Sequence, residues 1–181
     1  MSKTVVVFQS KYGSTQKYAE WIAEELSCHV FQRKNIKSTD LESYNTIIYG
    51  GGLYAGGVAG INIITKNFDK ICNKNIIVFT CGLADPADKE NTDHIKQSIN
   101  KVFTDKMQNK IKVFHLRGAI DYSKLGFIHK AMMAMLRKMT LRKDYDSLRS
   151  EDKEMLDTYG QVVDFTDKST IMPIVDYVRK L

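Results

Sequence analysis

Residues 4–15 read TVVVFQSKYGST, and this stretch decides the fold. Residues 4–8 form a short run of mostly β-branched apolar side chains, which is typical of a strand buried on both faces. Apolar residues then recur at helical spacing from Thr15 to about Ser27, which predicts an amphipathic helix. A buried strand, a short polar loop and a helix are the opening unit of an α/β protein.

The same alternation continues along the chain. We expect further strands at residues 28–32, 45–49, 75–81 and 111–116, and helices at about 58–71, 87–107 and 169–180. The long connections between strands require crossovers, so the sequence predicts an α/β fold, a three-layer doubly wound parallel sheet of five strands. Right-handed crossovers place the loops after the strands at one sheet edge, where folds of this class bind ligands.

The chain length of 181 residues and an ordinary charged fraction of 27% favour one globular domain over residues 1–181. The three cysteines, Cys28, Cys72 and Cys81, have neither CxxC nor metal-ligand spacing, and the four histidines are scattered. The pattern therefore predicts free thiols and no metal site. Free thiols and a start without a signal sequence favour the cytoplasm.

The basic character of the chain is concentrated in one segment. The net charge is +6, and residues 117–143 hold seven basic residues and one acid, which gives the same net +6. A local basic patch indicates a partner or a surface. The segment at about 121–167 also interrupts the alternation of strands and helices, so we expect a partly helical insert before the last helix.

The loop after the first strand can hold a phosphate. Ser10, Ser14 and Thr15 offer hydroxyl groups, Gly13 lets the backbone turn, and the helix start adds free N–H groups. The loop lacks the Gly-Lys-Ser/Thr ending of a Walker loop and the GxGxxG of a dinucleotide site, so it suits a monophosphate better than a pyrophosphate. The alternative is an ordinary helix cap, because serine and threonine cap helices routinely.

Residues 10–15, Ser-Lys-Tyr-Gly-Ser-Thr, resemble the phosphate loop of the flavodoxin family, a Ser/Thr-x-x-Gly-x-Thr pattern after the first strand. The resemblance implies flavin mononucleotide (FMN) as the cofactor, with its phosphate surrounded by Ser10, Lys11, Tyr12, Gly13, Ser14 and Thr15. It implies that one wall of the isoalloxazine site contains Gly52, Leu53, Tyr54, Ala55 and Gly56. It implies that the other wall contains Thr80, Cys81, Gly82, Leu83 and Ala84.

The residue types at these positions suit a flavin. Tyr54 is the candidate for stacking on the ring, and the alternative is a solvent-exposed loop tyrosine. Gly56 and Gly57 can let a peptide carbonyl turn toward flavin N5. Cys81 is either a small buried residue, which we favour, or a redox-active thiol. No residue is assigned as a catalytic acid or base, because the flavin carries the chemistry.

A second resemblance covers residues 117–122, 124–127, 132–139 and 162–167. These stretches resemble the quinone-linked protoporphyrinogen IX dehydrogenase type of flavodoxin-domain proteins, which has a basic, methionine-rich insert after the fifth strand. The resemblance implies an FMN-dependent oxidoreductase that takes electrons from protoporphyrinogen IX and passes them to a membrane quinone.

The insert carries a helical stripe of apolar residues, namely Phe127, Ile128, Ala131, Met132, Met135, Leu136 and Met139. A basic amphipathic helix can rest on anionic lipid at the inner face of the membrane, or receive a tetrapyrrole-like substrate with propionate groups. Composition alone favours a helix packed on the core. We assign the candidate surface for substrate or partner to Lys124, Phe127, Lys130, Met132, Met135, Arg137 and Lys138.

Two other functions stay open. The chain can be a flavodoxin-type electron carrier that docks a partner reductase through the basic insert, or a binding module that has lost the flavin. Plain carriers of this family are usually acidic, whereas this chain is basic, which favours an enzyme. We expect a redox partner protein or a quinone, and no nucleic acid.

Overall fold

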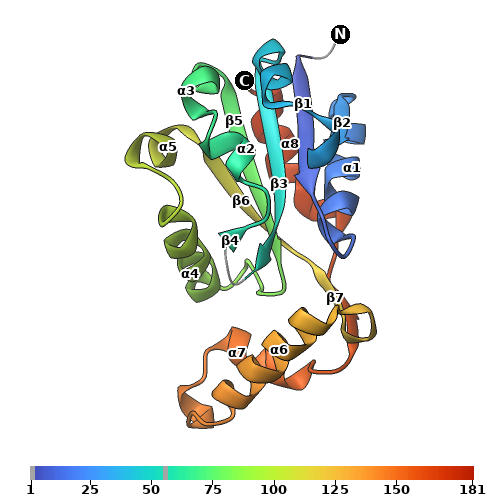
Figure 1. Ribbon diagram of the computed structural model, residues 1–181, viewed down its shortest axis with the longest axis vertical. Helices are drawn as coiled ribbons and strands as arrows, with labels where there is room; N and C mark the ends of the chain where they lie inside the picture. Colours follow the sequence, from blue (N-terminus) through green and yellow to red (C-terminus); the bar gives the residue numbers. More distant parts are fainter. Residues whose placement is uncertain (1–2, 55–56) are drawn as a thin grey trace.

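The computed structural model describes residues 3–54 and 57–181, and its centre is a parallel sheet (Figure 1). The strand order is β2-β1-β3-β5-β6. The strands are β1 (Thr4–Gln9), β2 (His29–Gln32), β3 (Thr46–Tyr54), β5 (Asn75–Gly82) and β6 (Lys112–Arg117), all parallel to their neighbours. A short strand, β4 (Gly57–Val58), pairs antiparallel with the end of β3. The predicted α/β fold with five parallel strands is confirmed.

Helices cover both faces of this sheet, because successive strand side chains point to opposite faces. Val6 and Ile48 pack with α1 (Ser14–Leu26) and α8 (Met172–Arg179) in one buried cluster. Val5 and Ile47 pack in a second cluster against the helices of the other face. Those helices are α2 (Asn62–Thr65), α3 (Phe68–Ile71), α4 (Lys89–Asn100) and α5 (Asp105–Lys110). Two 3-10 turns, η1 (Arg33–Asn35) and η2 (Ser38–Ser43), connect β2 to β3.

Two of the predicted helices were wrong in extent. The helix expected at 58–71 is β4 followed by α2 and α3, because the chain leaves helical geometry at Asn67, whose side chain donates to the Ile63 carbonyl at 2.9 Å. The helix expected at 87–107 ends at Asn100. A second helix, α5, starts at Asp105, because the Thr104 hydroxyl accepts from the Met107 N–H and caps it.

The strand expected at residues 45–49 is longer than predicted, since β3 continues to Tyr54. Gly50, Gly51 and Gly52 lie inside β3, because their backbones continue the pairing with β5 as far as Cys81. The strand therefore carries its pairing out to the sheet edge, and the connection to β4 follows Tyr54.

After β6 the chain leaves the sheet and forms an insert. Its stem is an antiparallel ribbon of β7 (Ala119–Asp121) and β8 (Val162–Asp164). Between these strands lie η3 (Tyr122–Lys124), α6 (Phe127–Thr140), η4 (Tyr145–Ser147) and α7 (Ser150–Asp157), and η5 (Lys168–Ile171) then leads back to α8. Figure 1 shows α6 and α7 at the end of the molecule opposite both termini, next to the carboxyl ends of the strands.

Candidate flavin site

The loop between β1 and α1 presents a helix start that no side chain caps within the described residues. Gly13 occupies the cap position with φ +101°, a backbone geometry that favours glycine, and a Cβ there would meet no atom within 4 Å. Its N–H donates to the Ser10 hydroxyl at 3.1 Å. An uncapped helix start leaves N–H groups and the positive end of the dipole for an anion.

The other two hydroxyls of the loop have structural partners. Ser14 Oγ accepts from the Ala119 N–H at 3.0 Å, which ties the loop to the stem of the insert. Thr15 is buried in the first turn of α1. Of the three hydroxyls predicted to meet a phosphate, only that of Ser10 has its contact inside the loop, where it accepts from the Gly13 N–H.

The end of β3 forms one wall of the site. The Tyr54 ring folds back over Gly52, since a Cβ on Gly52 would lie 3.0 Å from the ring. Leu53 packs against Gly82 of β5 in the same way, because a Cβ on Gly82 would lie 3.1 Å from Leu53 Cδ1. Burial raises the pKa of the Tyr54 phenol, so it stays neutral. The structure brings these four predicted residues together, and the predicted Ala55 and Gly56 lie outside the described residues.

The end of β5 forms the other wall, but two of its residues face the interior. Thr80 is fully buried and its hydroxyl is hydrogen-bonded to His115 Nδ1 at 2.8 Å. Cys81 is buried as well, and burial raises the pKa of its thiol to about 12. A thiol that stays protonated is a poor redox nucleophile. Leu83 and Ala84, in the loop that follows, are half-buried.

His129 of α6, one of four histidines scattered in the sequence, joins the two parts of the site. Its Nδ1 is hydrogen-bonded to the Tyr12 hydroxyl at 2.6 Å, and its Nε2 lies 3.5 Å from Lys11 Nζ. Its ring centroid lies 5.4 Å from that of Tyr54. One side chain of the insert therefore contacts both the β1–α1 loop and the wall formed by β3.

Arg117, at the end of β6, fastens the insert to the sheet edge. Its Nε donates to the Leu83 carbonyl at 3.1 Å, and its guanidinium lies 3.7 Å from the centroid of the Phe165 ring. The same group pairs with Glu154 of α7 and, at 3.6 Å, with Asp85. One arginine thus joins the loop after β5 to α7 and to the chain that follows β8.

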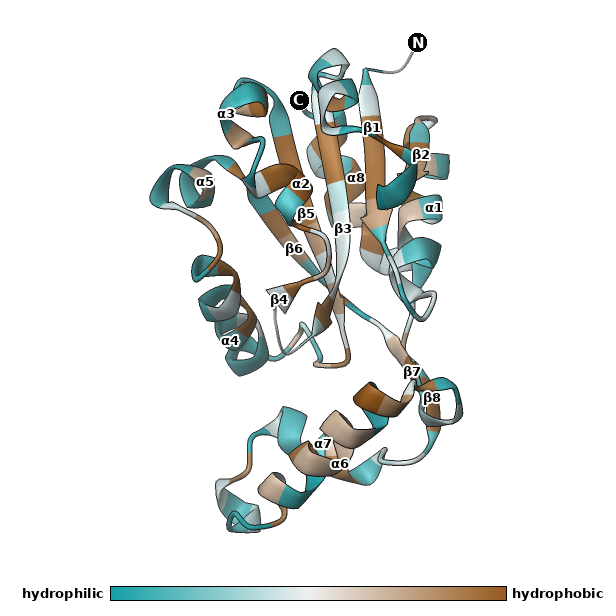
Figure 2. Ribbon diagram, in the orientation of Figure 1, coloured by the Kyte–Doolittle hydropathy of each residue, from teal (hydrophilic) through white to brown (hydrophobic). Residues whose placement is uncertain are grey.

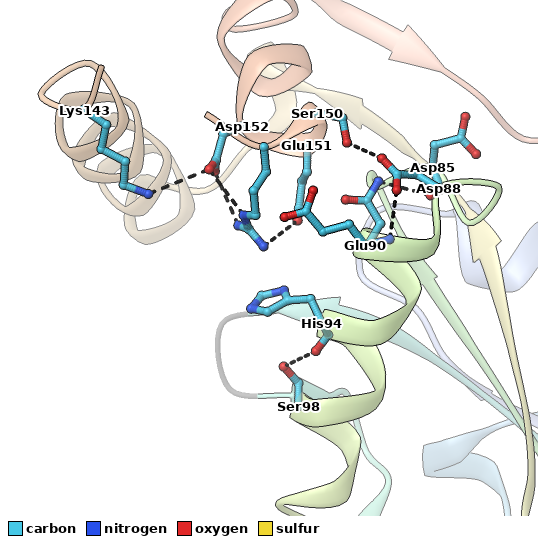
Figure 3. Close-up of polar contacts among 11 residues, drawn as sticks. Asp85, Asp88, Glu90, His94, Ser98, Lys143, Ser150, Glu151 and Asp152 are labelled. Atoms are coloured by element: carbon cyan, nitrogen blue, oxygen red, sulfur yellow. Dashed lines mark hydrogen bonds and ion pairs between the residues drawn. The ribbon is translucent and has the colours of Figure 1, made fainter. Parts of the chain in front are cut away.

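The starts of α4 and α7 form a second junction, shown in Figure 3. Asp88 caps α4 by accepting from the Glu90 N–H at 2.9 Å, and it also accepts from the Ser150 hydroxyl. On the insert side, Lys143 lies 3.7 Å from the buried carboxylate of Asp152. The insert is therefore held to the helix that follows β5 as well as to the loop after β1.

The predicted substrate or partner residues divide into two groups. Phe127 and Lys130 line a shallow pocket of about 440 Å³ together with Tyr122, Ala131, Ala134 and Tyr159. Lys124 pairs with Asp121 at 3.1 Å, and Arg137 lies over the Tyr159 ring at 5.0 Å. Met132, Met135 and Lys138 are exposed on α6.

An uncapped helix start and two strand ends at the switch point of a parallel sheet define a nucleotide-binding α/β protein. The model of the flavodoxin domain family matches residues 5–147, so the chain belongs to the flavodoxin domain family. FMN is the cofactor that goes with this membership. The residues present fit it: Ser10, Gly13 and the α1 amides would hold the phosphate, and Tyr54 and Leu83 would flank the ring.

Several solved structures are similar to this chain. Flavodoxin 2 from Bacillus cereus is 15% identical, with a TM-score of 0.47 over 64% of this chain and 84% of that one. The Trp repressor binding protein from Bacillus subtilis is 12% identical, with a TM-score of 0.45 over 91% and 99%. A WrbA-like flavodoxin from Agrobacterium tumefaciens is 22% identical, with a TM-score of 0.40 over 56% and 73%. No curated protein matches the sequence.

Proposed function

We propose that this protein is an FMN-dependent oxidoreductase of the protoporphyrinogen IX dehydrogenase type. It takes electrons from a planar organic substrate and passes them through FMN to a quinone or another acceptor. The observation that carries the proposal is the position of the insert: His129 of α6 contacts both Tyr12 and Tyr54. A cover over the flavin edge suits an enzyme that selects a substrate better than a carrier that must expose this edge.

The side chains of the insert suit such a substrate. The pocket beside α6 is lined by Tyr122, Phe127 and Tyr159, which offer flat apolar surfaces to a ring system. Lys130 lines this pocket and Arg137 lies over the Tyr159 ring, so two cations could pair with carboxylate substituents of a substrate. An apolar body with acidic arms, such as a tetrapyrrole with propionates, matches both features.

The chain supplies position and environment to the reaction. FMN supplies the electron-transfer chemistry when bound. The α1 amides and Ser10 would hold the phosphate, and the neutral phenol of Tyr54 would give one wall a flat face. His129 contacts both the loop and the wall, and in this position it would limit access of water to the ring.

An electron carrier is the second candidate. Residues 117–143 carry a net charge of +6, which fits docking to an acidic reductase. The two functions differ in whether the isolated protein turns over an organic substrate.

The deciding experiment is anaerobic turnover of protoporphyrinogen IX by the FMN-loaded protein with a soluble quinone, followed by porphyrin fluorescence. We expect multiple turnovers, and we expect Lys130→Ala with Arg137→Ala to raise KM for this substrate about tenfold through lost charge pairing. The control is Lys66→Ala with Lys70→Ala, which removes the same charge from exposed sites on the far helices. Absence of turnover together with rapid flavin reduction by a partner reductase would establish the carrier instead.

A further inference from the structure

Three side chains of the candidate flavin site form a hydrogen-bonded chain that fixes the state of His129. Lys11 Nζ lies 3.5 Å from His129 Nε2, and Nδ1 of the same ring lies 2.6 Å from the Tyr12 hydroxyl. An ammonium group only donates, so Nε2 accepts and the ring proton sits on Nδ1. The Tyr12 oxygen therefore accepts from His129 Nδ1–H and, at 3.5 Å, from the Gly126 N–H. The insert thus holds the β1–α1 loop through a neutral imidazole.

The same imidazole ring reaches the other part of the site. The ring centroids of His129 and Tyr54 lie 5.4 Å apart, with their planes 33° from parallel. FMN would extend from the β1–α1 loop, which would hold its phosphate, to the wall at Tyr54, which would flank its ring. His129 therefore bridges the two elements between which the cofactor would lie. Figure 1 shows the insert beyond the carboxyl ends of the strands, so this edge of the sheet faces the insert.

The helix that carries His129 is not packed on the core, although composition alone favoured that arrangement. Of the residues of α6, Thr140 alone is buried, and Phe127 and Ile128 are 88% and 71% exposed. Figure 2 shows the hydrophobic colour of α6 at the end of the molecule, away from the sheet. Within the described residues no helix, α6 included, is long and apolar enough to cross a bilayer. Few apolar contacts therefore oppose a movement of α6 away from the sheet.

The stem of the insert supplies a fixed point for such a movement. The strands β7 and β8 pair over three residues each, and the Ala119 N–H donates to Ser14 Oγ at 3.0 Å. Ile120 and Tyr122 are buried in the apolar cluster at this stem. The hydrogen bonds of His129 are exposed or half-buried, and such bonds contribute modestly to stability. They can therefore break while the stem stays in place.

We propose that the insert is a gate for the flavin site and that His129 is its latch. FMN enters and leaves when His129 releases Tyr12 and Tyr54, and α6 then closes over the site again. The latch joins side chains of the protein itself, so it holds with or without the cofactor. This inference rests on FMN binding and not on the proposed substrate, so it applies equally to a dehydrogenase and to an electron carrier.

The contacts of nearby residues single out His129 for this role. Lys130 Nζ donates to the Ser123 carbonyl at 3.4 Å, which is a contact inside the insert, and the Ile128 side chain is largely exposed. Arg117 and Ser150 fasten α7, rather than α6, to the sheet domain. His129 is therefore the side chain of α6 whose polar contacts a movement of this helix must break.

A gate has a kinetic signature that a residue in contact with the flavin lacks. A contact that holds the free and the loaded protein alike slows entry and exit by the same factor and leaves Kd unchanged. A side chain that binds FMN itself stabilises only the loaded protein, so its loss weakens Kd. The rate constants of flavin exchange therefore distinguish the two roles without any measurement of turnover.

The test is stopped-flow mixing of the full-length apoprotein with FMN and, separately, with riboflavin, followed by the change in flavin fluorescence. The slope and intercept of the observed rate against protein concentration give the association and dissociation rate constants. We expect His129→Ala to raise both about tenfold for both flavins, with Kd changed less than about threefold, because more of the protein is open at any time. The matched control is His94→Ala, which removes an exposed histidine of α4 and should leave both rate constants unaltered.

A second variant keeps the inference testable if His129→Ala disturbs α6. Tyr12→Phe removes the hydroxyl that His129 binds and keeps the ring, so it should raise the same two rate constants. Combining Tyr12→Phe with His129→Ala should add nothing to the effect of His129→Ala, because the contact between the two side chains is already lost.

Three results would overturn the inference. Unchanged rate constants in both variants would mean that the insert does not control flavin exchange. Faster dissociation alone, with a weaker Kd for both flavins, would make His129 a contact of the flavin ring. A weaker Kd for FMN but not for riboflavin would place His129 at the phosphate. None of these results bears on turnover of protoporphyrinogen IX, which tests the proposed function separately.

Discussion

At the scale of single residues, burial decides what the cysteine thiols can do. Cys81 and Cys28 both have a raised pKa, about 12 and about 11, because burial disfavours the thiolate. Cys81 therefore acts as a small apolar residue under the flavin site. The buried environment of Cys81 favours this role over that of a redox-active thiol, and the sequence does not show this environment.

His115 gives the clearest pH prediction. Burial, with a smaller effect of Lys96, lowers its pKa from 6.5 to about 4 in the folded chain. The unfolded chain, with the higher pKa, binds the proton more tightly than the folded chain. The contribution of His115 to the free energy of unfolding is therefore fully present above pH 6.5 and is lost as the pH falls toward 4. We expect a loss of about 2 kcal/mol from this group, allowing for its partial exposure.

Urea unfolding of the wild type and of His115→Gln at pH 7 and pH 5 measures this loss. Glutamine can keep a hydrogen bond to Thr80 but does not titrate. The variant should lose less stability than the wild type between the two pH values. An identical pH dependence in both proteins would mean that His115 does not contribute.

At the scale of elements, the site depends on where β6 ends. Gly118 follows β6, and its N–H donates to the Gly82 carbonyl at 2.6 Å. A Cβ on Gly118 would lie 3.0 Å from Cys81 Sγ and 3.5 Å from Ser14, so this crossing favours glycine. The chain thereby passes directly over the end of β5 and the start of α1, and the insert begins at the flavin site.

The start of α1 carries the prediction for this scale. Ser10→Ala removes the hydroxyl that accepts from the Gly13 N–H, and with it a group that would donate to the phosphate. We expect weaker FMN binding by about tenfold, with little change for riboflavin, which has no phosphate.

Fluorescence titration of the apoprotein with each flavin tests this. The single variant is preferable to a change that includes Ser14 or Thr15, because Ser14 holds the Ala119 N–H and Thr15 is buried. Equal losses for FMN and riboflavin would place Ser10 away from the phosphate.

At the scale of the whole molecule, the insert is held less firmly than the sheet. Its own apolar cluster has three buried members, Ile120, Tyr122 and Leu125, whereas each face of the sheet packs a far larger set. Polar contacts of Arg117, Asp88 and His129 also hold the insert to the sheet domain. Segments with few buried apolar contacts open at lower free energy than the core.

Arg117→Ala should loosen the insert while the sheet stays intact. Arg117 is the shared partner of Leu83, Asp85 and Glu154, so its loss frees α7 from the loop after β5. Hydrogen exchange should quicken severalfold in α6 and α7 and stay unchanged in β1, β3 and β5.

The matched control is Arg179→Ala, which removes an exposed arginine paired with Glu25 at 3.6 Å. It should leave exchange in the insert unaltered. Faster exchange throughout the chain after Arg117→Ala would show instead that the insert and the sheet unfold together.

The sequence by itself determined the sheet and the place of its ligand edge. Runs such as residues 4–8 and 75–81 bury both faces of a strand, and that signal is local in the chain. The loop at residues 10–15 could be found for the same reason, since its glycine and hydroxyls are neighbours in sequence. Helix ends such as those at Asn67 and Thr104 were missed, because side-chain bonds to the backbone set them against the apolar pattern.

The tertiary structure alone decided how the insert meets the flavin site and which side of α6 faces outward. His129 and Tyr12 are 117 residues apart, and a scattered histidine gives no sign of such a contact. The apolar stripe of α6 was visible in the sequence, but periodicity shows only that a helix has two sides. Which side is buried depends on the crossing at Gly118 and the anchor at Arg117, and these contacts join distant parts of the chain.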